Sequence, residues 1–137
     1  MSDQFNIFLI CFCTAFFEEI IFRYYLIKGL GKSFSRKKSI VISSLLFAIC
    51  HLANSNFTAI AFFSHFLGGI IYAYAYMQAK YIYYPIGLHF GWNYAQWLFS
   101  LPMSGTIKEG WFNLTFPTVN YWFGGAYGIE GGLASLI

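Results

Sequence analysis

Four apolar segments separated by short polar turns constrain the fold of this chain more than any other feature. They cover residues 5–27, 39–53, 58–78 and 86–101, and several of them reach the roughly 17 to 25 residues that a helix needs to cross a bilayer. Only 9% of the residues are charged, whereas a soluble domain has about 25%. We therefore predict an all-α fold, a polytopic transmembrane bundle with about four spanning helices.

The last part of the chain differs from the four apolar segments. A loop is predicted over 102–116, and the sequence WFGGAYGIEGGLASLI that ends the chain is apolar but rich in glycine. We expect it to form a partial fifth helix, broken or re-entrant. Pro85 is predicted at the first position of the fourth helix. Residues 1–137 should together form a single integral-membrane domain.

Basic residues place the loops relative to the membrane. Five of them fall within the segment KGLGKSFSRKK, namely Lys28, Lys32, Arg36, Lys37 and Lys38. The positive-inside rule favours a cytoplasmic loop over 28–38, and the alternation of the helices brings Lys80 to the same side. Nucleic-acid binding is the less favoured explanation for this cluster. We therefore predict that the cluster lies next to membrane lipid and binds no nucleic acid.

Three polar clusters interrupt the apolar segments. They are Glu18-Glu19-x-x-x-Arg23 on the first helix, Phe47-x-x-x-His51 on the second and His89-x-x-x-Asn93 on the fourth. Counted at about 1.5 Å per residue, Glu18, His51 and His89 lie about 15, 18 and 14 Å from the ends of their helices on the basic side. We infer that these side chains meet at one depth, in the cytoplasmic half of the membrane, because intramembrane ionisable residues usually face a shared cavity.

The residue types in these clusters suit the hydrolysis of a peptide bond. Glu19 and Arg23 are four residues apart and should form an ion pair along the helix, which leaves Glu18 for other work. A carboxylate in a poorly hydrated cavity is a stronger base than one in water, so Glu18 beside His51 can activate a water molecule. His89 and Asn93 share one helix face and carry N–H groups suited to stabilise an oxyanion.

The motifs EEIIFR, FAICH and HFGWN resemble, in this order, the EExxxR, FxxxH and HxxxN motifs of the CPBP family, the CAAX proteases and bacteriocin-processing proteins also called Abi. The match covers residues 16–93. The resemblance implies an intramembrane endopeptidase in which Glu18 and His51 activate water and His89 and Asn93 form the oxyanion hole. It further implies that Glu19 and Arg23 support the site, and that the substrate is a membrane-associated protein or peptide.

The resemblance also bears on the setting of the protein. The segment GGAYGIEGG looks like the tail of some bacterial members, which favours a bacterial plasma membrane. Most members have further helices before the first motif, so three expectations stay open: the chain is a minimal core, a fragment, or one part of a larger assembly. In the last two cases, further helices or an additional subunit would complete the bundle.

Two other functions remain open from the sequence. In the first, Glu18, His51 and His89 bind a divalent metal such as zinc, whose coordinated water attacks the substrate. In the second, the chain is a non-catalytic membrane protein for bacteriocin immunity or interaction.

Two further polar residues belong to none of the three motifs. His65 on the third helix is expected to have a structural role facing Gly68 and Gly69, with a place in the cavity as the alternative. Glu130 is expected either to cap the glycine-rich segment or to line the mouth of the cavity.

Overall fold

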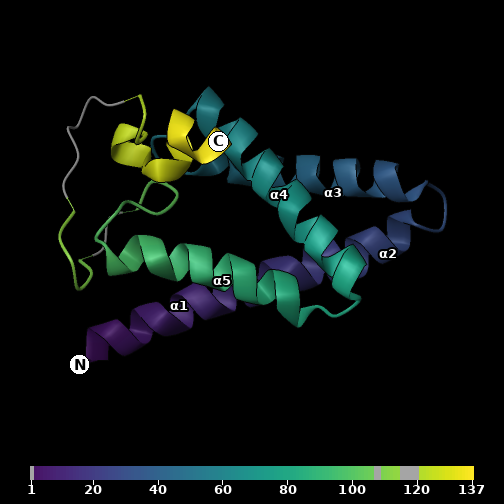
Figure 1. The fold of residues 1–137 in the computed structure, drawn as a ribbon, viewed down its shortest axis with the longest axis horizontal. Coiled ribbons are helices and arrows are strands. Elements are labelled where there is room, and N and C mark those ends of the chain that lie inside the picture. The colour runs from purple at the N-terminus through teal and green to yellow at the C-terminus, as the bar shows by residue number, and fades with distance from the viewer. Residues whose placement is uncertain (1, 107–108, 115–120) are drawn as a thin grey trace.

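The protein is a bundle of helices of unequal length. The computed structural model describes residues 2–106, 109–114 and 121–137, and these residues form helices and no β-strand (Figure 1). The helices of the bundle are α1 (Ser2–Glu19), η1 (Ile20–Leu26), α2 (Ile27–Leu30), α3 (Arg36–Cys50), η2 (His51–Ala53), α4 (Ala59–Ala79) and α5 (Tyr83–Leu98). Three short helices follow: η3 (Gly125–Tyr127), η4 (Ile129–Gly131) and η5 (Leu133–Leu136). The predicted all-α fold is confirmed.

The first helix runs without a break through α1, η1 and α2, but η1 is a π-helix. Apart from Phe22, its buried residues recur every fourth position, at Cys11, Ala15, Glu19, Arg23 and Ile27. Such a spacing exceeds the 3.6 residues of an α-helical turn, so the stripe would drift around a regular helix. Hydrogen bonds from i to i+5 widen the turn in η1 and counteract this drift. The π-helix therefore keeps the second half of the stripe directed into the bundle.

Small residues bring α3 and α4 into close contact. On α3 the inward positions include Ser39, Ser43 and Ser44, all fully buried. Opposite them on α4 is Gly69, where an added Cβ would lie 3.0 Å from both Cα and Cβ of Ser44. Small residues at a helix contact let the backbones approach closely, as is typical of membrane bundles.

Side-chain and backbone caps set the ends of these two helices. Ser35 accepts a hydrogen bond from the backbone N–H of Lys38 at 3.5 Å and starts α3. Thr58 accepts one from the N–H of Ala61 at 3.0 Å and starts α4, which ends at Lys80 in the left-handed conformation. Caps of this type satisfy the unpaired N–H groups of a first helical turn.

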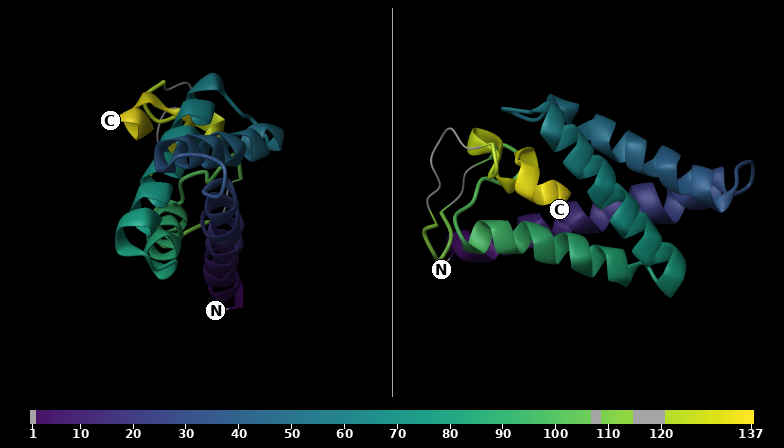
Figure 2. Two further views of the ribbon diagram at one scale, coloured as in Figure 1. Left: turned by 90° about the vertical axis from the view of Figure 1, so that its right-hand side faces the viewer. Right: turned by 45° about the horizontal axis from the view of Figure 1, so that its top comes forward.

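Helix α5 lies beside α1 and also packs on α4, as two views of the molecule show (Figure 2). It begins at Tyr83, so Pro85 is its third residue and the prediction of the first position is wrong. The proline is still tolerated because the N–H groups of a first turn have no partner within the helix.

The glycine-rich segment is confirmed as broken, but its turns are short 3-10 helices rather than parts of an α-helix. Gly128 separates two of them with a φ of 96°, and a Cβ there would lie 1.8 Å from the carbonyl oxygen of Pro102. The segment packs against α4. Part of the predicted loop over 102–116, at residues 107, 108, 115 and 116, lies outside the described residues.

The distribution of polarity is the reverse of that in a soluble domain. Charged and polar side chains such as Glu19, Arg23 and Gln96 are buried, whereas large apolar ones such as Phe17 and Ile71 are more than half exposed. Within the part of the chain that the structure describes, two helices are long and apolar enough to cross a membrane, Gln4–Leu30 and Ala59–Ala79. Helices α3 and α5 contain 15 and 16 residues and are shorter than a typical span.

Candidate active site

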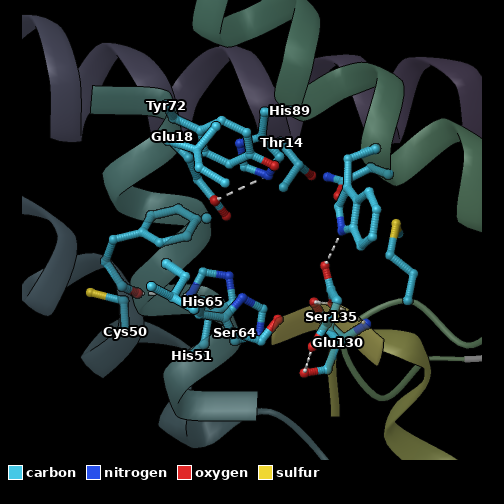
Figure 3. Close-up of a pocket in the computed structure, with 18 of the residues that line it drawn as sticks. Thr14, Glu18, Cys50, His51, Ser64, His65, Tyr72, His89, Glu130 and Ser135 are labelled. Atoms are coloured by element: carbon cyan, nitrogen blue, oxygen red, sulfur yellow. Dashed lines mark hydrogen bonds and ion pairs between the residues drawn. The ribbon is translucent and has the colours of Figure 1, made fainter. Parts of the chain in front are cut away.

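One cavity of about 560 Å³ lies between the helices and the C-terminal segment. All four predicted catalytic side chains line it, namely Glu18, His51, His89 and Asn93. Figure 3 shows Glu18 and His89 on one side of the cavity and His51 on the opposite side. Residues from three motifs on three helices therefore converge on one space, as the sequence predicted.

The EExxxR motif divides its two carboxylates between different environments. The Nε atom of Arg23 lies 3.1 Å from Oε2 of Glu19, and both side chains are fully buried. The guanidinium also donates to the carbonyl oxygen of Gly69 at 3.2 Å and lies 4.4 Å from the centre of the Phe47 ring. The predicted ion pair is confirmed, and it leaves Glu18 facing the cavity, where its side chain is 27% exposed.

The FxxxH motif joins this ion pair to the first histidine. The Nδ1 atom of His51 lies 2.8 Å from the carbonyl oxygen of Phe47, one of the carbonyls left unpaired at the end of α3. A carbonyl oxygen only accepts, so Nδ1 carries a proton and Nε2 of a neutral His51 is an acceptor. The Phe47 ring, which also lies against the Arg23 guanidinium, contacts the His51 ring with 4.6 Å between centres. The four-residue spacing thus fixes both the tautomer and the location of His51.

The HxxxN motif lies against both glutamates. The Nδ1 atom of His89 is 3.0 Å from Oε1 of Glu19, while its Nε2 atom is 3.8 Å from Oε2 of Glu18. The imidazole stacks on the Tyr72 ring at 4.8 Å, and Asn93 lies on the same face of α5 with 5% of its surface exposed. The sequence predicted that Glu18 and His51 act as partners. Among the described residues, however, the histidine with the shortest contact to Glu18 is His89.

His65 is part of the same cavity, so the expectation of a role facing Gly68 and Gly69 is wrong. Its ring stacks on His51 with 4.0 Å between centres and 24° between planes. Its Nε2 atom is 2.6 Å from the hydroxyl of Tyr127 in the C-terminal segment. The physical reason is the direction of α4, whose buried face carries His65 beside Tyr72 into the space between α3 and α5.

Glu130 lines the cavity and joins three parts of the chain. Its Oε1 atom accepts hydrogen bonds from Trp92 and Gln96 of α5 at 2.8 and 3.2 Å. Its Oε2 atom accepts from the backbone N–H and the hydroxyl of Ser104 at 3.1 and 2.6 Å. Burial raises the pKa of this carboxyl, but His65 and these hydrogen bonds outweigh the burial, so the pKa of Glu130 lies below its usual range.

Glu18, His51 and His89, named as possible zinc ligands, come from three different helices that surround the cavity. Within residues 2–106, 109–114 and 121–137, no three His, Cys, Asp or Glu side chains come close enough together to hold a metal ion. Nδ1 of His51 and of His89 faces a protein oxygen, which leaves Nε2 of each ring for any other ligand. The two imidazoles lie on opposite sides of the cavity (Figure 3).

Comparison with known proteins places this site in a family. The family model for type II CAAX prenyl endopeptidases, Rce1-like, matches residues 2–95, which contain all three motifs. Comparisons with curated proteins and with solved structures gave no match. The resemblance to CAAX proteases that the three motifs indicated is thereby confirmed. The chain belongs to the Rce1-like family of type II CAAX prenyl endopeptidases, whose members are embedded in the membrane.

Proposed function

We propose that the protein is an intramembrane endopeptidase that hydrolyses a peptide bond of a membrane-associated protein or peptide. The observation that carries this proposal is the convergence of Glu18, His51, His89 and Asn93 on one cavity of about 560 Å³. A cavity of this volume accommodates a few residues of an extended peptide. Peptide hydrolysis fits the site because a base, an acceptor for a second proton and two N–H donors surround the same space.

In the proposed reaction, Glu18 and His51 activate a water molecule. The Nε2 atom of a neutral His51 is available as an acceptor because its Nδ1–H group is bound to Phe47. The water oxygen attacks the carbonyl carbon of the substrate while its proton passes to the Glu18 carboxylate. The tetrahedral intermediate then collapses with cleavage of the C–N bond, and the proton is delivered to the leaving nitrogen.

His89 and Asn93 are proposed to stabilise the oxyanion. Since the Nδ1–H group of His89 is directed at Glu19, its Nε2 atom can donate only when the ring is doubly protonated. A ring in this form has a carboxylate oxygen beside each of its N–H groups, at 3.0 Å from Nδ1 and 3.8 Å from Nε2. Asn93 donates through its amide without any change of charge. Glu19 then has two tasks, since it balances Arg23 and orients His89.

Cleavage of a membrane-tethered reporter by the purified protein in liposomes tests the proposal. We expect cleavage by the wild type and a loss of kcat of at least ~10²-fold in Glu18→Gln and in His51→Ala, since general bases contribute 10²–10⁴-fold. A non-catalytic immunity or interaction protein would show no cleavage, and cleavage that survives both substitutions would exclude the proposed roles. Cys13→Ser on the exposed face of α1 is the control.

A metal-dependent reaction is separated by chelation. The proposed steps use side chains alone, so we expect the activity to persist in the presence of a chelator and the purified protein to contain less than one equivalent of zinc. Loss of activity on chelation with recovery on addition of zinc would replace the proposed mechanism by one with metal-activated water.

We also propose that the loop over 28–38 faces the cytoplasm of a bacterium, because five basic residues lie there. Labelling of a single cysteine introduced at Ser33, in a chain without its native cysteines, measures this orientation. Labelling in intact cells by a reagent that does not cross the membrane would contradict it.

A further inference from the structure

The imidazole of His51 is held between two neighbours of different origin. One neighbour is Phe47, which belongs to the same motif and supplies both a carbonyl acceptor and a ring contact. The other is His65 of α4, whose ring lies 4.0 Å from His51 and nearly parallel to it. His65 lies outside the three motifs, and the proposed reaction gives it no chemical step.

His65 is itself fixed by the C-terminal segment. The hydroxyl of Tyr127 lies 2.6 Å from its Nε2 atom, and the side-chain amide of Asn54 donates to the same hydroxyl at 3.4 Å. Burial raises the pKa of Tyr127 to about 12, so the phenol keeps its proton. The Tyr127 hydroxyl accepts from Asn54 and shares a second hydrogen bond with Nε2 of His65, whose direction depends on the tautomer of that ring.

A second aromatic ring supports this arrangement. Phe57 lies at 6.5 Å from His65 with 12° between the planes, and it contacts the Tyr127 ring edge-on at 5.7 Å. The orientation of His65 is thus determined by a hydrogen bond at its edge and by rings on its faces. A side chain constrained in this way presents a rigid flat surface to His51.

His51 needs such a surface because of its place in the chain. It lies where α3 ends and the backbone tightens into η2, so the regular packing of a helix interior does not constrain its side chain. The hydrogen bond from Nδ1 fixes one edge of the ring, but it leaves the ring free to tilt about that bond. A parallel ring at 4.0 Å removes this freedom and fixes the direction of Nε2.

We propose that His65 is a positioning residue for His51 and that Tyr127 locks it in place, so that the C-terminal segment takes part in orienting the imidazole of the active site. The inference takes the catalytic role of His51 from the proposed function. The contacts of His65 with His51 and Tyr127 do not depend on that proposal. The ring face of His65 is the functional part, and its nitrogen atoms serve to hold that face.

Nuclear magnetic resonance of the ring nitrogens tests the positioning without any substrate. The sequence contains three histidines, so a protein labelled with ¹⁵N-histidine gives three sets of imidazole signals, and the set that disappears in His51→Ala belongs to His51. We expect sharp His51 ring signals in the wild type and broadened ones in His65→Leu and in Tyr127→Phe, because the ring then tilts about its hydrogen bond to Phe47. His65→Phe keeps a flat ring but loses the hydrogen bond to Tyr127, so its broadening should match that of Tyr127→Phe and be smaller than that of His65→Leu.

Tyr74→Phe provides a matched control, because it removes a tyrosine hydroxyl from the same kind of residue at an exposed hydrogen bond to Gln78. The His51 signals should not change in this variant. Unchanged line widths of the His51 ring signals in both His65→Leu and Tyr127→Phe would overturn the proposal. Should His65→Leu fail to fold, Tyr127→Phe decides, since it removes one oxygen atom only.

Kinetics on the membrane-tethered reporter give the second measurement. A misplacement of about 1 Å at an active site can cost up to 10²-fold in rate, so we expect His65→Leu to lower kcat roughly tenfold or more with little change in KM. His65→Phe should recover part of the lost kcat and resemble Tyr127→Phe, whereas a role of His65 in acid–base chemistry would allow no recovery by phenylalanine. Equal losses in His65→Phe and His65→Leu, or no loss in any variant, would contradict positioning by the ring face. If the wild type cleaves nothing, the proposed function fails and the ¹⁵N spectra alone decide about His65.

Discussion

Adjacent carboxylates in the EExxxR motif have different tasks because successive helical residues point in different directions. Glu19 points into the bundle, where Arg23 balances its charge and His89 uses its second oxygen. Glu18 points into the cavity, and its Oε2 atom makes no hydrogen bond to any described residue. A sequence with one glutamate could not supply both a balanced ion pair and a base directed at a substrate.

Removal of one member of the buried ion pair should be more harmful than removal of both. We expect Arg23→Met to destabilise the fold by about 3 kcal/mol, because the Glu19 charge is left buried without a partner. The double variant Glu19→Gln/Arg23→Met should regain most of this stability but little of the activity, since His89 loses the carboxylate that orients it. Thermal unfolding in detergent and the kcat on the reporter measure the two effects, and additive destabilisation by the two changes would exclude the coupling.

The sequence was sufficient for the residues of the three motifs but not for His65. Glu19 and Arg23 could be predicted as a pair because a local spacing of four residues determines their contact. The location of His65 in the cavity depends on which face of α4 is buried. The buried face includes His65, Gly69, Tyr72 and Tyr76, which follow a helical repeat. Apolar residues on all sides of α4 make this repeat hard to recognise in the sequence. A search for small and polar residues on one face would have included His65.

At the scale of elements, the π-helix η1 is the feature that the sequence did not reveal. It follows directly after Glu19 and includes Arg23, and the hydroxyl of Ser43 on α3 donates to the carbonyl oxygen of Phe22 within it at 2.7 Å. Hydrogen bonds from a neighbouring helix stabilise irregular backbone in a membrane. The four-residue repeat of buried positions is present in the sequence, but the contact of η1 with α3 is visible only in the structure.

The contact between α3 and α4 gives a prediction with its own control. In Gly69→Ala the new methyl group would lie 3.0 Å from Ser44, so the helices must separate, and we expect a loss of stability of about 1 to 3 kcal/mol from overpacking. In Gly68→Ala the closest atom is at 3.9 Å, so the gain of up to about 1 kcal/mol from helix propensity should dominate. Thermal unfolding of both variants decides, and equal stability would show that the close approach is unimportant.

At the scale of the whole molecule, Glu130 fastens the C-terminal segment over the cavity. Its four hydrogen-bond donors come from α5 and from the loop after it. In Glu130→Ala these buried donors lose their acceptor, and each unsatisfied group costs about 1 to 3 kcal/mol. We expect this variant to lose at least about 2 kcal/mol of stability and to become susceptible to proteolysis after residue 121, whereas Glu130→Gln should lose less because it keeps one acceptor oxygen.

The stability that Glu130 provides should depend on pH in one direction. Since the pKa of Glu130 is lowered in the folded protein, its contribution is complete at pH values above the usual pKa of about 4.3. It decreases as the pH falls through the lower pKa of the folded state. The difference in unfolding temperature between the wild type and Glu130→Gln should therefore shrink on acidification, and a difference that grows instead would contradict the lowered pKa.

The whole fold could be predicted only where hydrophobic segments define it. The continuous first helix from α1 to α2, and the helices α3, α4 and α5, were predicted to within about three residues at their ends, because long apolar segments mark them. The position of the C-terminal segment depends on contacts between Glu130 and residues 26 to 38 positions earlier. A single sequence contains no signal for such distant pairs, so the role of Glu130 stayed undecided until the structure joined them.

The length of the first helix has a consequence for the surrounding lipid. Its apolar part, Gln4–Leu30, contains 27 residues and is about 40 Å long, whereas the hydrocarbon core of a bilayer measures about 30 Å. Such a hydrophobic mismatch is relieved by helix tilt or by local thickening of the bilayer. We expect lipids with longer acyl chains to bring this helix closer to upright. Bilayer thickness would then act as a physical effector, transmitted along the helix and through the π-helix to the two carboxylates that precede it.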